Sequence, residues 1–177
     1  MPNVITFLRI LIVPFFFSTF LYYDPSKDYL RLWALVLFLV GSLTDALDGL
    51  VARLRKKTTE LGRFLDPLAD KLLLLSGYLG IFFAKSFPLL PPLWVLVTIV
   101  FRDLVIVGGL IVLSMSGRKI EVRPNLLGKT TTAIQMATMV ALLLLLPISR
   151  ILWNLTTVLT ILSGFTYVFR EMGRAKR

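Results

Sequence analysis

Long apolar stretches that recur along the chain are the feature that most constrains its fold. They cover, to within several residues, 4–23, 30–53, 62–85, 92–116, 126–147 and 150–170. A helix of about 20 residues crosses the roughly 30 Å hydrocarbon core of a bilayer, so the pattern predicts six transmembrane helices. The chain is therefore expected to be an all-α integral membrane protein, and no linker is long enough to divide residues 1–177 into more than one domain.

Lysine and arginine are distributed unevenly between the two sets of loops. The segments after the second and fourth predicted spans and after the sixth hold most of these residues, whereas the opposite loops hold only Lys27, Arg31, Lys85 and Arg150. Basic loops are retained in the cytoplasm. We therefore expect a multi-pass protein with both termini, and Arg9 near the start of the first span, on the cytoplasmic side.

Histidine and cysteine are absent, and the formal net charge is +10. Their absence removes the commonest general base and the thiol and imidazole metal ligands, so any catalysis must rest on carboxylates. A positive charge suits nucleic acid or anionic lipid, but a chain in which 56% of residues are hydrophobic favours lipid. Membrane lipids are the expected partners, and nucleic acid is not.

Four aspartates lie inside or at the cytoplasmic ends of predicted spans. Asp45 and Asp48 are three residues apart in the second span, and Asp66 and Asp70 are four residues apart in the third. Each spacing places a pair on one face of a helix. A carboxylate at the bilayer centre costs about 2.5–3.5 kcal/mol, and less toward the interface, so something must offset the charge. Because a short loop makes the two helices antiparallel neighbours, the sequence predicts a cage of four carboxylates.

Such a cage has a chemical consequence. Carboxylates this close cannot all remain ionised without cations, and oxygen ligands alone favour a hard divalent ion such as Mg²⁺ or Mn²⁺. Two ions would balance the charge, and a pair about 3.5–4 Å apart supports in-line displacement at phosphorus. A capping role for Asp66, or its pairing with Arg53 or Lys71, is the structural alternative, but one ion pair does not require four carboxylates in a membrane.

Small residues accompany the aspartates. Gly41, Gly49 and Ala52 lie in the second span and Gly62 opens the third. They allow a backbone to approach another backbone or the phosphates of a ligand. Tight helix packing alone is the favoured interpretation for Gly41.

The segment from Asp45 to Asp70 follows the pattern D-x2-D-G-x2-A-R-x8-G-x3-D-x3-D. It resembles the signature of the CDP-alcohol phosphotransferase family at all eight fixed positions. The segment from Pro2 to Arg9 is similar to the N-terminal opening of that family, and Asp66-Pro-Leu-Ala-Asp70-Lys71 is similar to its phosphatidylglycerol-forming branch. The resemblance implies the CDP-alcohol phosphotransferase fold, with six transmembrane helices and, as is usual in the family, a homodimer.

The resemblance also implies an activity and roles for the matching residues. The family transfers the phosphatidyl group of CDP-diacylglycerol to an alcohol and releases CMP. Asp45, Asp48 and Asp66 would hold two metal ions, and Asp70, also near a metal, would deprotonate the acceptor hydroxyl. The residues implied to bind the CDP moiety are Gly49, Ala52, Arg53 and Gly62.

Basic residues later in the chain are candidates for binding the acceptor. Arg102 lies inside the fourth span, Arg118 in the following loop and Lys129 at the start of the fifth span. A cationic pocket suits a phosphorylated acceptor such as glycerol 3-phosphate, or the headgroup of an anionic lipid. The alternatives are a structural ion pair between Arg102 and Asp103 and a purely topological role for Lys129.

Two acceptors are open. The N-terminal opening, the Asp66–Lys71 segment and the closing Leu162-Ser-Gly164 favour glycerol 3-phosphate, which would give phosphatidylglycerophosphate. The Arg102-Asp103 pair, with no second arginine in its span, resembles cardiolipin synthases of the same fold, which use phosphatidylglycerol. A cation transporter is the alternative of a different class, but it would place its acids near the middle of the membrane on broken helices. A noncatalytic scaffold would leave the acids without a purpose.

Overall fold

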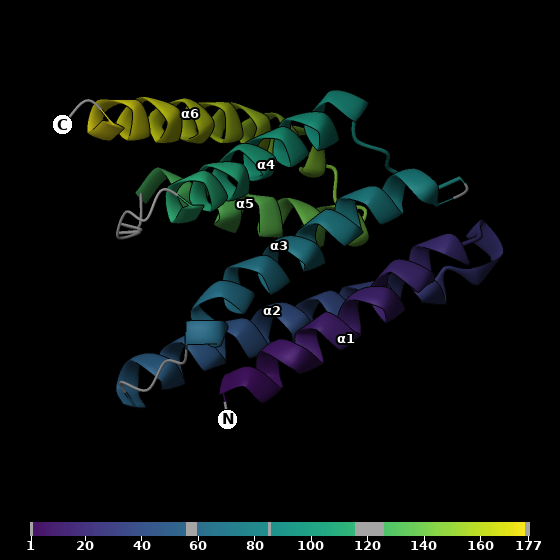
Figure 1. Ribbon diagram of the computed structural model, residues 1–177. Coiled ribbons are helices and arrows are strands. Elements are labelled where there is room, and N and C mark those ends of the chain that lie inside the picture. Colours follow the sequence, from purple (N-terminus) through teal and green to yellow (C-terminus); the bar gives the residue numbers. More distant parts are fainter. Residues whose placement is uncertain (1, 56–59, 85, 116–125, 176–177) are drawn as a thin grey trace. The chain divides into compact units, whose positions relative to one another are not determined.

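The computed structural model is all-helical over the residues it describes (Figure 1). These residues are 2–55, 60–84, 86–115 and 126–175, and side chains are described for 9–44, 71–84, 86–106, 108 and 126–167. The helices are α1 (Pro2–Leu21), α2 (Tyr29–Arg55), α3 (Glu60–Phe83), α4 (Leu93–Met115), α5 (Leu126–Leu143) and α6 (Ser149–Ala175). A short 3-10 helix, η1 (Pro25–Lys27), joins α1 to α2. Within this part of the chain there is no strand, so the predicted all-α fold is confirmed.

Two helix ends differ from the sequence-based prediction. α5 ends at Leu143 rather than near 147, because the chain turns at Leu145, whose φ is 54°, before Pro147. α6 continues to Ala175 rather than ending near 170. Hydropathy marks only the apolar part of a helix, whereas the arginines, glutamate and methionine that follow are good helix formers and extend it.

Only part of the membrane prediction is supported by the helices themselves. Among the described residues, one helix, Leu126–Leu143, is both long and apolar enough to cross a membrane. Shorter apolar stretches of 10–17 residues occur at Arg9–Leu21, Tyr29–Thr44 and Lys71–Phe83. Six membrane spans with cytoplasmic termini stay a prediction.

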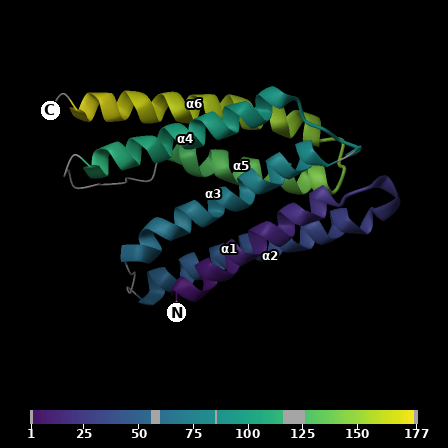
Figure 2. The same cartoon turned by 45° about the vertical axis from the view of Figure 1, so that its right-hand side comes forward.

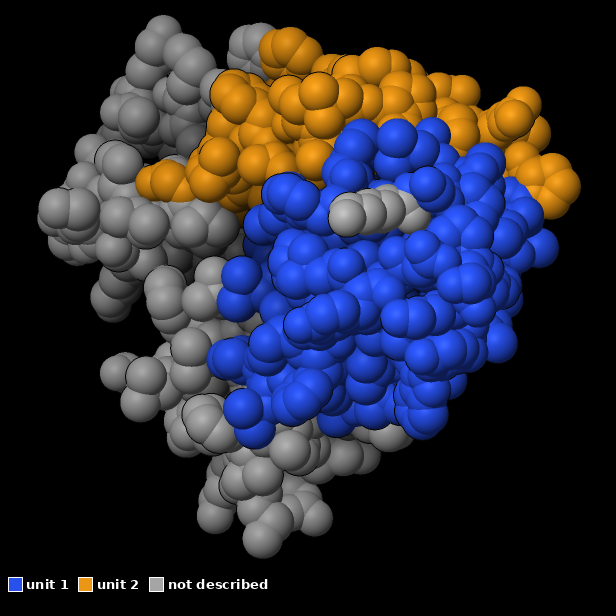
Figure 3. Space-filling view, turned by 90° about the vertical axis from the view of Figure 1, so that its right-hand side faces the viewer, with its two compact units in different colours: residues 1–90, 142–146 blue, residues 91–141, 147–177 orange. Residues whose placement is uncertain are grey.

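The helices group into two compact units, which Figure 3 distinguishes by colour. Unit 1 comprises residues 1–90 and 142–146, and therefore contains α1, α2 and α3. Unit 2 comprises residues 91–141 and 147–177, with α4, α6 and most of α5. The expectation of a single domain over residues 1–177 stays a prediction.

Unit 1 is built around α1, which packs against both α2 and α3 (Figure 2). Aromatic rings fill the interface. The ring of Phe16 lies 5.2 Å from that of Phe20 and 5.8 Å from that of Phe38 in α2, measured between centroids. All three rings are buried, so α1 and α2 are joined by apolar contact alone at this level.

Two glycines allow the helices of unit 1 to approach closely. A Cβ atom on Gly80 of α3 would lie 2.4 Å from the ring of Phe20, and one on Gly41 of α2 would lie 2.8 Å from the side chain of Leu73. Any larger residue would force these neighbours to move. The packing role expected for Gly41 is thereby confirmed.

The turn between α1 and α2 is held by an ion pair. Arg31 donates from Nε and Nη2 to Asp28 at 2.8 and 2.6 Å, and from Nη1 to the carbonyl of Leu143 at 2.5 Å. Tyr23 donates its hydroxyl to Asp28 at 3.3 Å. The hydrogen bonds from Arg31 hold the pKa of Asp28 below its ordinary value.

Unit 2 is held by a different kind of contact. Buried polar side chains recur every three or four residues along the facing sides of α5 and α6. The three connections are Thr131 Oγ1 to the carbonyl of Leu159 (3.2 Å), Gln135 Nε2 to Thr160 Oγ1 (3.2 Å) and Thr138 Oγ1 with Thr156 Oγ1 (2.7 Å). Hydrogen bonds of this kind join helices in a surrounding that offers no water. We call these side chains the α5–α6 polar ladder.

Candidate functional site

The four predicted metal-binding aspartates lie on two helices of unit 1. Asp45 and Asp48 belong to α2, and Asp66 and Asp70 to α3. Their side chains lie outside those that the structure describes, and the two pairs are located by their backbone positions in α2 and α3. α2 and α3 pack against each other and run in opposite directions (Figures 1 and 2).

The register of α2 against α3 follows from the contact between Gly41 and Leu73. In antiparallel helices, a step forward along one is matched by a step back along the other, and both rise about 1.5 Å per residue. The position opposite Asp45 is therefore 69, next to Asp70, and the position opposite Asp48 is that of Asp66. Both aspartate pairs lie at one level along the two helices, as the predicted cage requires.

The donor set fits hard divalent cations. Four carboxylates at one level, with no nitrogen or sulfur ligand available in the sequence, match the oxygen coordination that Mg²⁺ and Mn²⁺ prefer. Among the side chains that the structure describes, which do not include these four aspartates, no group of three or more acidic residues could hold a metal. Because of its oxygen donors, the aspartate set is the candidate metal centre, and the roles of its members stay predictions.

The residues implied to bind CDP share this end of unit 1. They follow the aspartates of α2 and precede those of α3, and their side chains also lie outside the described set. They are Gly49, Ala52 and Arg53 in α2 and Gly62 in α3. Their positions on the aspartate-bearing helices agree with the predicted role without testing it.

α1 carries a buried basic residue for which the sequence did not predict a role in binding or catalysis. Arg9 is 1% exposed and is among the largest fully buried side chains described. A basic residue inside an apolar stretch was the available signal, but it was used only for topology and for the family resemblance.

Arg102 of α4 is a second buried arginine, and it lies in unit 2. Its Nη1 donates to Asp103 Oδ1 at 2.8 Å and its Nη2 to Ser163 Oγ at 3.1 Å. A Cβ atom on Gly128 of α5 would be 3.5 Å from Nη2, and one on Gly164 of α6 would be 3.7 Å from Cγ. The guanidinium is thus enclosed by three helices. The ion pair with Asp103, weighed as the structural alternative, is present, and acceptor binding by Arg102 stays a prediction.

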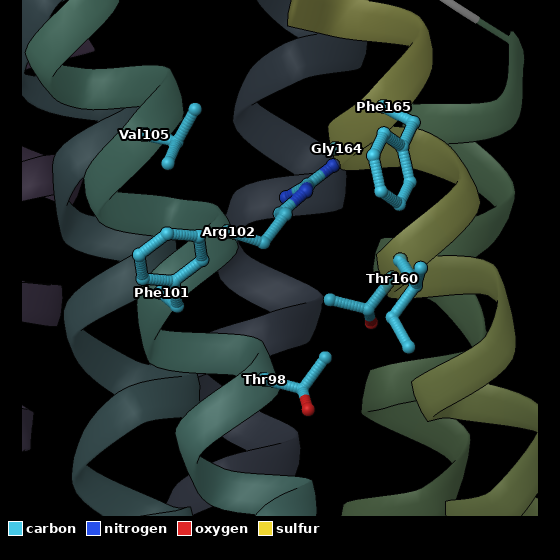
Figure 4. Close-up of a pocket in the computed structure, with 8 residues that line it drawn as sticks. Thr98, Phe101, Arg102, Val105, Thr160, Gly164 and Phe165 are labelled. Carbon is cyan, nitrogen blue, oxygen red and sulfur yellow. The ribbon is translucent and has the colours of Figure 1, made fainter.

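A recess of about 250 Å³ lies between α4 and α6 beside this arginine (Figure 4). In the close-up, Arg102 extends from α4 toward Gly164, and Phe101 and Phe165 come from the two opposite helices. The walls of the recess are formed by Thr98, Phe101, Arg102, Val105, Thr160, Ile161, Gly164 and Phe165. The surface that lines the recess is almost entirely apolar, so the recess can accept an apolar group next to a buried cation.

The other two acceptor candidates are less constrained. Lys129 is exposed in the first turn of α5 and directly follows Gly128, which lies against Arg102. Exposure suits a topological role and an acceptor contact equally well. Arg118 lies outside the described residues. All three candidates belong to unit 2, whereas the aspartates belong to unit 1.

Comparison with known proteins gives consistent matches along the chain. A sequence model of CDP-alcohol phosphatidyltransferases matches residues 1–165. The CDP-diacylglycerol–glycerol-3-phosphate 3-phosphatidyltransferase of Bacillus subtilis is 35% identical over 153 residues, which cover 81% of this chain and 76% of that protein. The protein of the same name from Aquifex aeolicus is 30% identical over 186 residues, covering 96% and 98%. A probable phosphatidylglycerophosphate synthase of Mycobacterium tuberculosis is 30% identical over 179 residues, covering 97% and 81%.

The family match contains α1 to α5 in full and most of α6. It therefore includes both aspartate pairs, the buried Arg9 and the α4–α6 recess. The all-helical architecture and the aspartate pattern agree with this match, and the chain belongs to the CDP-alcohol phosphatidyltransferase family.

Proposed function

We propose that this protein transfers the phosphatidyl group of CDP-diacylglycerol to glycerol 3-phosphate, forming phosphatidylglycerophosphate and CMP. The observation that carries the proposal is the complete aspartate pattern from Asp45 to Asp70 in a chain that aligns over most of its length with relatives named for this reaction. The names of those relatives favour glycerol 3-phosphate over the other acceptors considered.

The reaction is a displacement at phosphorus. The acceptor hydroxyl oxygen attacks the phosphorus that carries the diacylglycerol, a new P–O bond forms, and the P–O bond to CMP breaks. Asp70 takes the hydroxyl proton, for which its carboxylate must come within hydrogen-bond reach of the acceptor. The electron pair of the broken bond leaves on the phosphate of CMP.

The remaining site residues bind and orient the substrate. Asp45, Asp48 and Asp66 would hold divalent cations, with Asp70 also near a metal. Bound Mg²⁺ or Mn²⁺ would neutralise charge on the diphosphate and lower the pKa of the acceptor hydroxyl. The CDP moiety is assigned to Gly49, Ala52, Arg53 and Gly62, with Arg53 making charge-assisted hydrogen bonds to phosphate.

Arg102, Arg118 and Lys129 are proposed to supply positive charge for the phosphate of the acceptor. Among the described residues, Nε of Arg102 has no hydrogen-bond acceptor, whereas Nη1 and Nη2 are bound to Asp103 and Ser163. The Nε–H of a guanidinium held at both Nη1 and Nη2 is therefore available to a ligand. Such a donor suits an anionic acceptor.

We further propose that the protein is a multi-pass membrane homodimer whose active site faces the cytoplasm. The substrate carries two acyl chains and resides in a bilayer. One face of α2 exposes large apolar side chains at a spacing of three or four residues: Leu32, Val36, Leu39 and Leu43. A stripe of this kind suits contact with lipid or with a second subunit.

Phosphatidylglycerol is the second candidate acceptor, and the product would then be cardiolipin. The α4–α6 recess favours this alternative, because an apolar cavity beside Arg102 fits an acyl chain that glycerol 3-phosphate lacks. The same aspartate chemistry would apply. Only the acceptor would change.

Purified protein supplied with CDP-diacylglycerol and Mg²⁺ or Mn²⁺ separates these possibilities. The acceptors are offered singly, CMP release is measured, and the lipid product is identified by mass. CMP release with glycerol 3-phosphate supports the proposal, and release with phosphatidylglycerol alone supports the alternative. Absence of CMP release with both acceptors, under conditions in which the protein is folded, would contradict the enzymatic assignment.

A further inference from the structure

The buried Arg9 of α1 requires a counter-charge. An arginine side chain stays protonated in a folded protein, and an isolated buried cation is strongly unfavourable. With 1% of its surface exposed, Arg9 cannot rely on solvent. The acidic residues of unit 1 that lie at the level of Arg9 are therefore the candidates for its counter-charge.

The register between α1 and α2 places Arg9 level with an aspartate. These antiparallel helices meet where the rings of Phe16 and Phe38 lie 5.8 Å apart. Seven residues before Phe16 is Arg9, and seven residues after Phe38 is Asp45. Because both helices rise equally per residue, the two positions lie at one level.

The register between α1 and α3 gives the same result. These helices run in the same direction, and Gly80 lies directly against Phe20. Eleven residues before Phe20 is Arg9, and eleven residues before Gly80 is position 69, next to Asp70. Figure 2 shows the N-terminal end of α1 at the same end of the unit as the end of α2 and the start of α3.

The other acids of unit 1 are poorly placed. Asp24 and Asp28 follow the opposite end of α1, about 20 Å from Arg9 along the helix axis, and Asp28 is paired with Arg31. Glu60 precedes Asp70 by ten residues, which is about 15 Å of helix. The four-aspartate set is thus the negative charge at the level of Arg9.

We propose that Arg9 is the internal counter-charge of the four-aspartate site, a positioning residue that acts on bound ligands through its charge. The inference rests on the proposed function, because it needs the aspartates to bind divalent cations. Four carboxylates and two divalent ions sum to zero formal charge, so Arg9 adds one positive charge to the loaded site. That charge attracts the diphosphate of CDP-diacylglycerol, and in the metal-free site it offsets repulsion among the carboxylates.

Removing the charge of Arg9 should change the affinity for the metal and the affinity for the nucleotide in opposite directions. Arg9 repels incoming cations and attracts the anionic nucleotide. Removing its charge in Arg9→Gln is expected to tighten Mn²⁺ binding roughly three- to tenfold and to weaken binding of CDP to the Mn²⁺-loaded protein by a similar factor. Arg9→Lys keeps the charge and is expected to stay within about twofold of the wild type for both ligands.

The experiment uses the full-length purified protein. Free Mn²⁺ is measured by electron paramagnetic resonance during a titration without nucleotide, and CDP is then titrated into the Mn²⁺-loaded protein. Arg31→Gln is the matched control, because it removes an ion-paired arginine at the other end of unit 1, and it is expected to change neither affinity. Weaker or unchanged binding of both ligands in Arg9→Gln would identify a merely structural arginine and overturn the proposal.

A second measurement covers the case in which Arg9→Gln is unstable. Neutralising one carboxylate should compensate for the lost cation, so adding Asp45→Asn or Asp70→Asn is expected to restore the metal-free thermal stability of Arg9→Gln. Failure of both second substitutions would contradict the counter-charge role.

A wild-type protein that binds no Mn²⁺ and releases no CMP would overturn the proposed function together with this inference. A wild type that does both, without the opposite shifts in Arg9→Gln, would overturn the inference alone.

Discussion

Unit 1 and unit 2 hold their helices together by different contacts. In unit 1, aromatic rings and glycines bring α1 against α2 and α3, and the acidic residues gather at one end of the helices. In unit 2, α5 and α6 are joined by buried hydroxyl and amide groups, and the buried arginine is bound by Asp103 and Ser163. Close apolar packing holds the helices of unit 1 in place without using polar groups that could bind a ligand, so the aspartates stay available. The sequences of α5 and α6 contain no group of aspartates, and hydrogen bonds between their polar side chains can hold these helices together.

The largest effect is expected from a substitution that leaves packing intact. Asp70→Asn removes the proposed base and one metal ligand while keeping the shape of the side chain. Turnover is expected to fall by at least about 10²–10⁴-fold, because general base catalysis is lost. CMP release measures the rate, and a thermal unfolding scan shows whether unit 1 is still folded. Near-normal turnover would exclude Asp70 from the base role.

A packing substitution in unit 1 should instead lower the stability of the protein. Gly80→Ala places a methyl group 2.4 Å from the buried ring of Phe20 and is expected to destabilise the protein by about 1–3 kcal/mol. Gly108→Ala is the matched control, since a Cβ atom there meets nothing within 4 Å, and it is expected to be neutral or slightly stabilising. Denaturant unfolding measures both. Equal effects at the two positions would contradict the close approach of α1 and α3.

A smaller loss is expected when a connection of the α5–α6 polar ladder is removed. Thr138→Val breaks the 2.7 Å hydrogen bond with Thr156 and should cost about 0.6–1.7 kcal/mol. Thr157→Val is the control, because that hydroxyl donates within its own helix to the carbonyl of Trp153. A double-mutant cycle of Thr138 and Thr156 isolates the pair energy, and additive effects would show that the two residues are not coupled.

The smallest effect concerns the turn between α1 and α2. The pKa of Asp28 is lowered by Arg31, so the carboxylate stabilises the folded state above its ordinary pKa of about 3.9, and this contribution is lost as the pH falls through the lower folded pKa. Half of the side chain is exposed, so the contribution is small. The stability difference between wild type and Asp28→Asn is expected to shrink on acidification below about pH 4. A difference that does not change between pH 6 and pH 3 would contradict this contribution of the ion pair.

Local patterns in the sequence predict much of the fold. Apolar stretches of membrane-spanning length predict the six helices, and the fixed spacing from Asp45 to Asp70 identifies the family. Gly41 was correctly expected to serve packing. The possible pair of Arg102 and Asp103 was also visible, because the residues are adjacent.

Other features depend on contacts between distant segments. The α5–α6 polar ladder was not predicted, because threonine is intermediate in hydropathy and can also bond to its own helix. Gly80 gave no local signal of its contact with Phe20. Arg9 acquires its significance only when the register of three helices brings it level with Asp45 and Asp70.

The number of Mn²⁺ ions bound per chain decides whether α2 and α3 share one metal centre. If α2 and α3 together form one metal centre, the wild type binds two ions, and both Asp48→Asn in α2 and Asp66→Asn in α3 lose high-affinity binding. Retention of both ions after either substitution, in folded protein, would contradict a centre shared by the two helices.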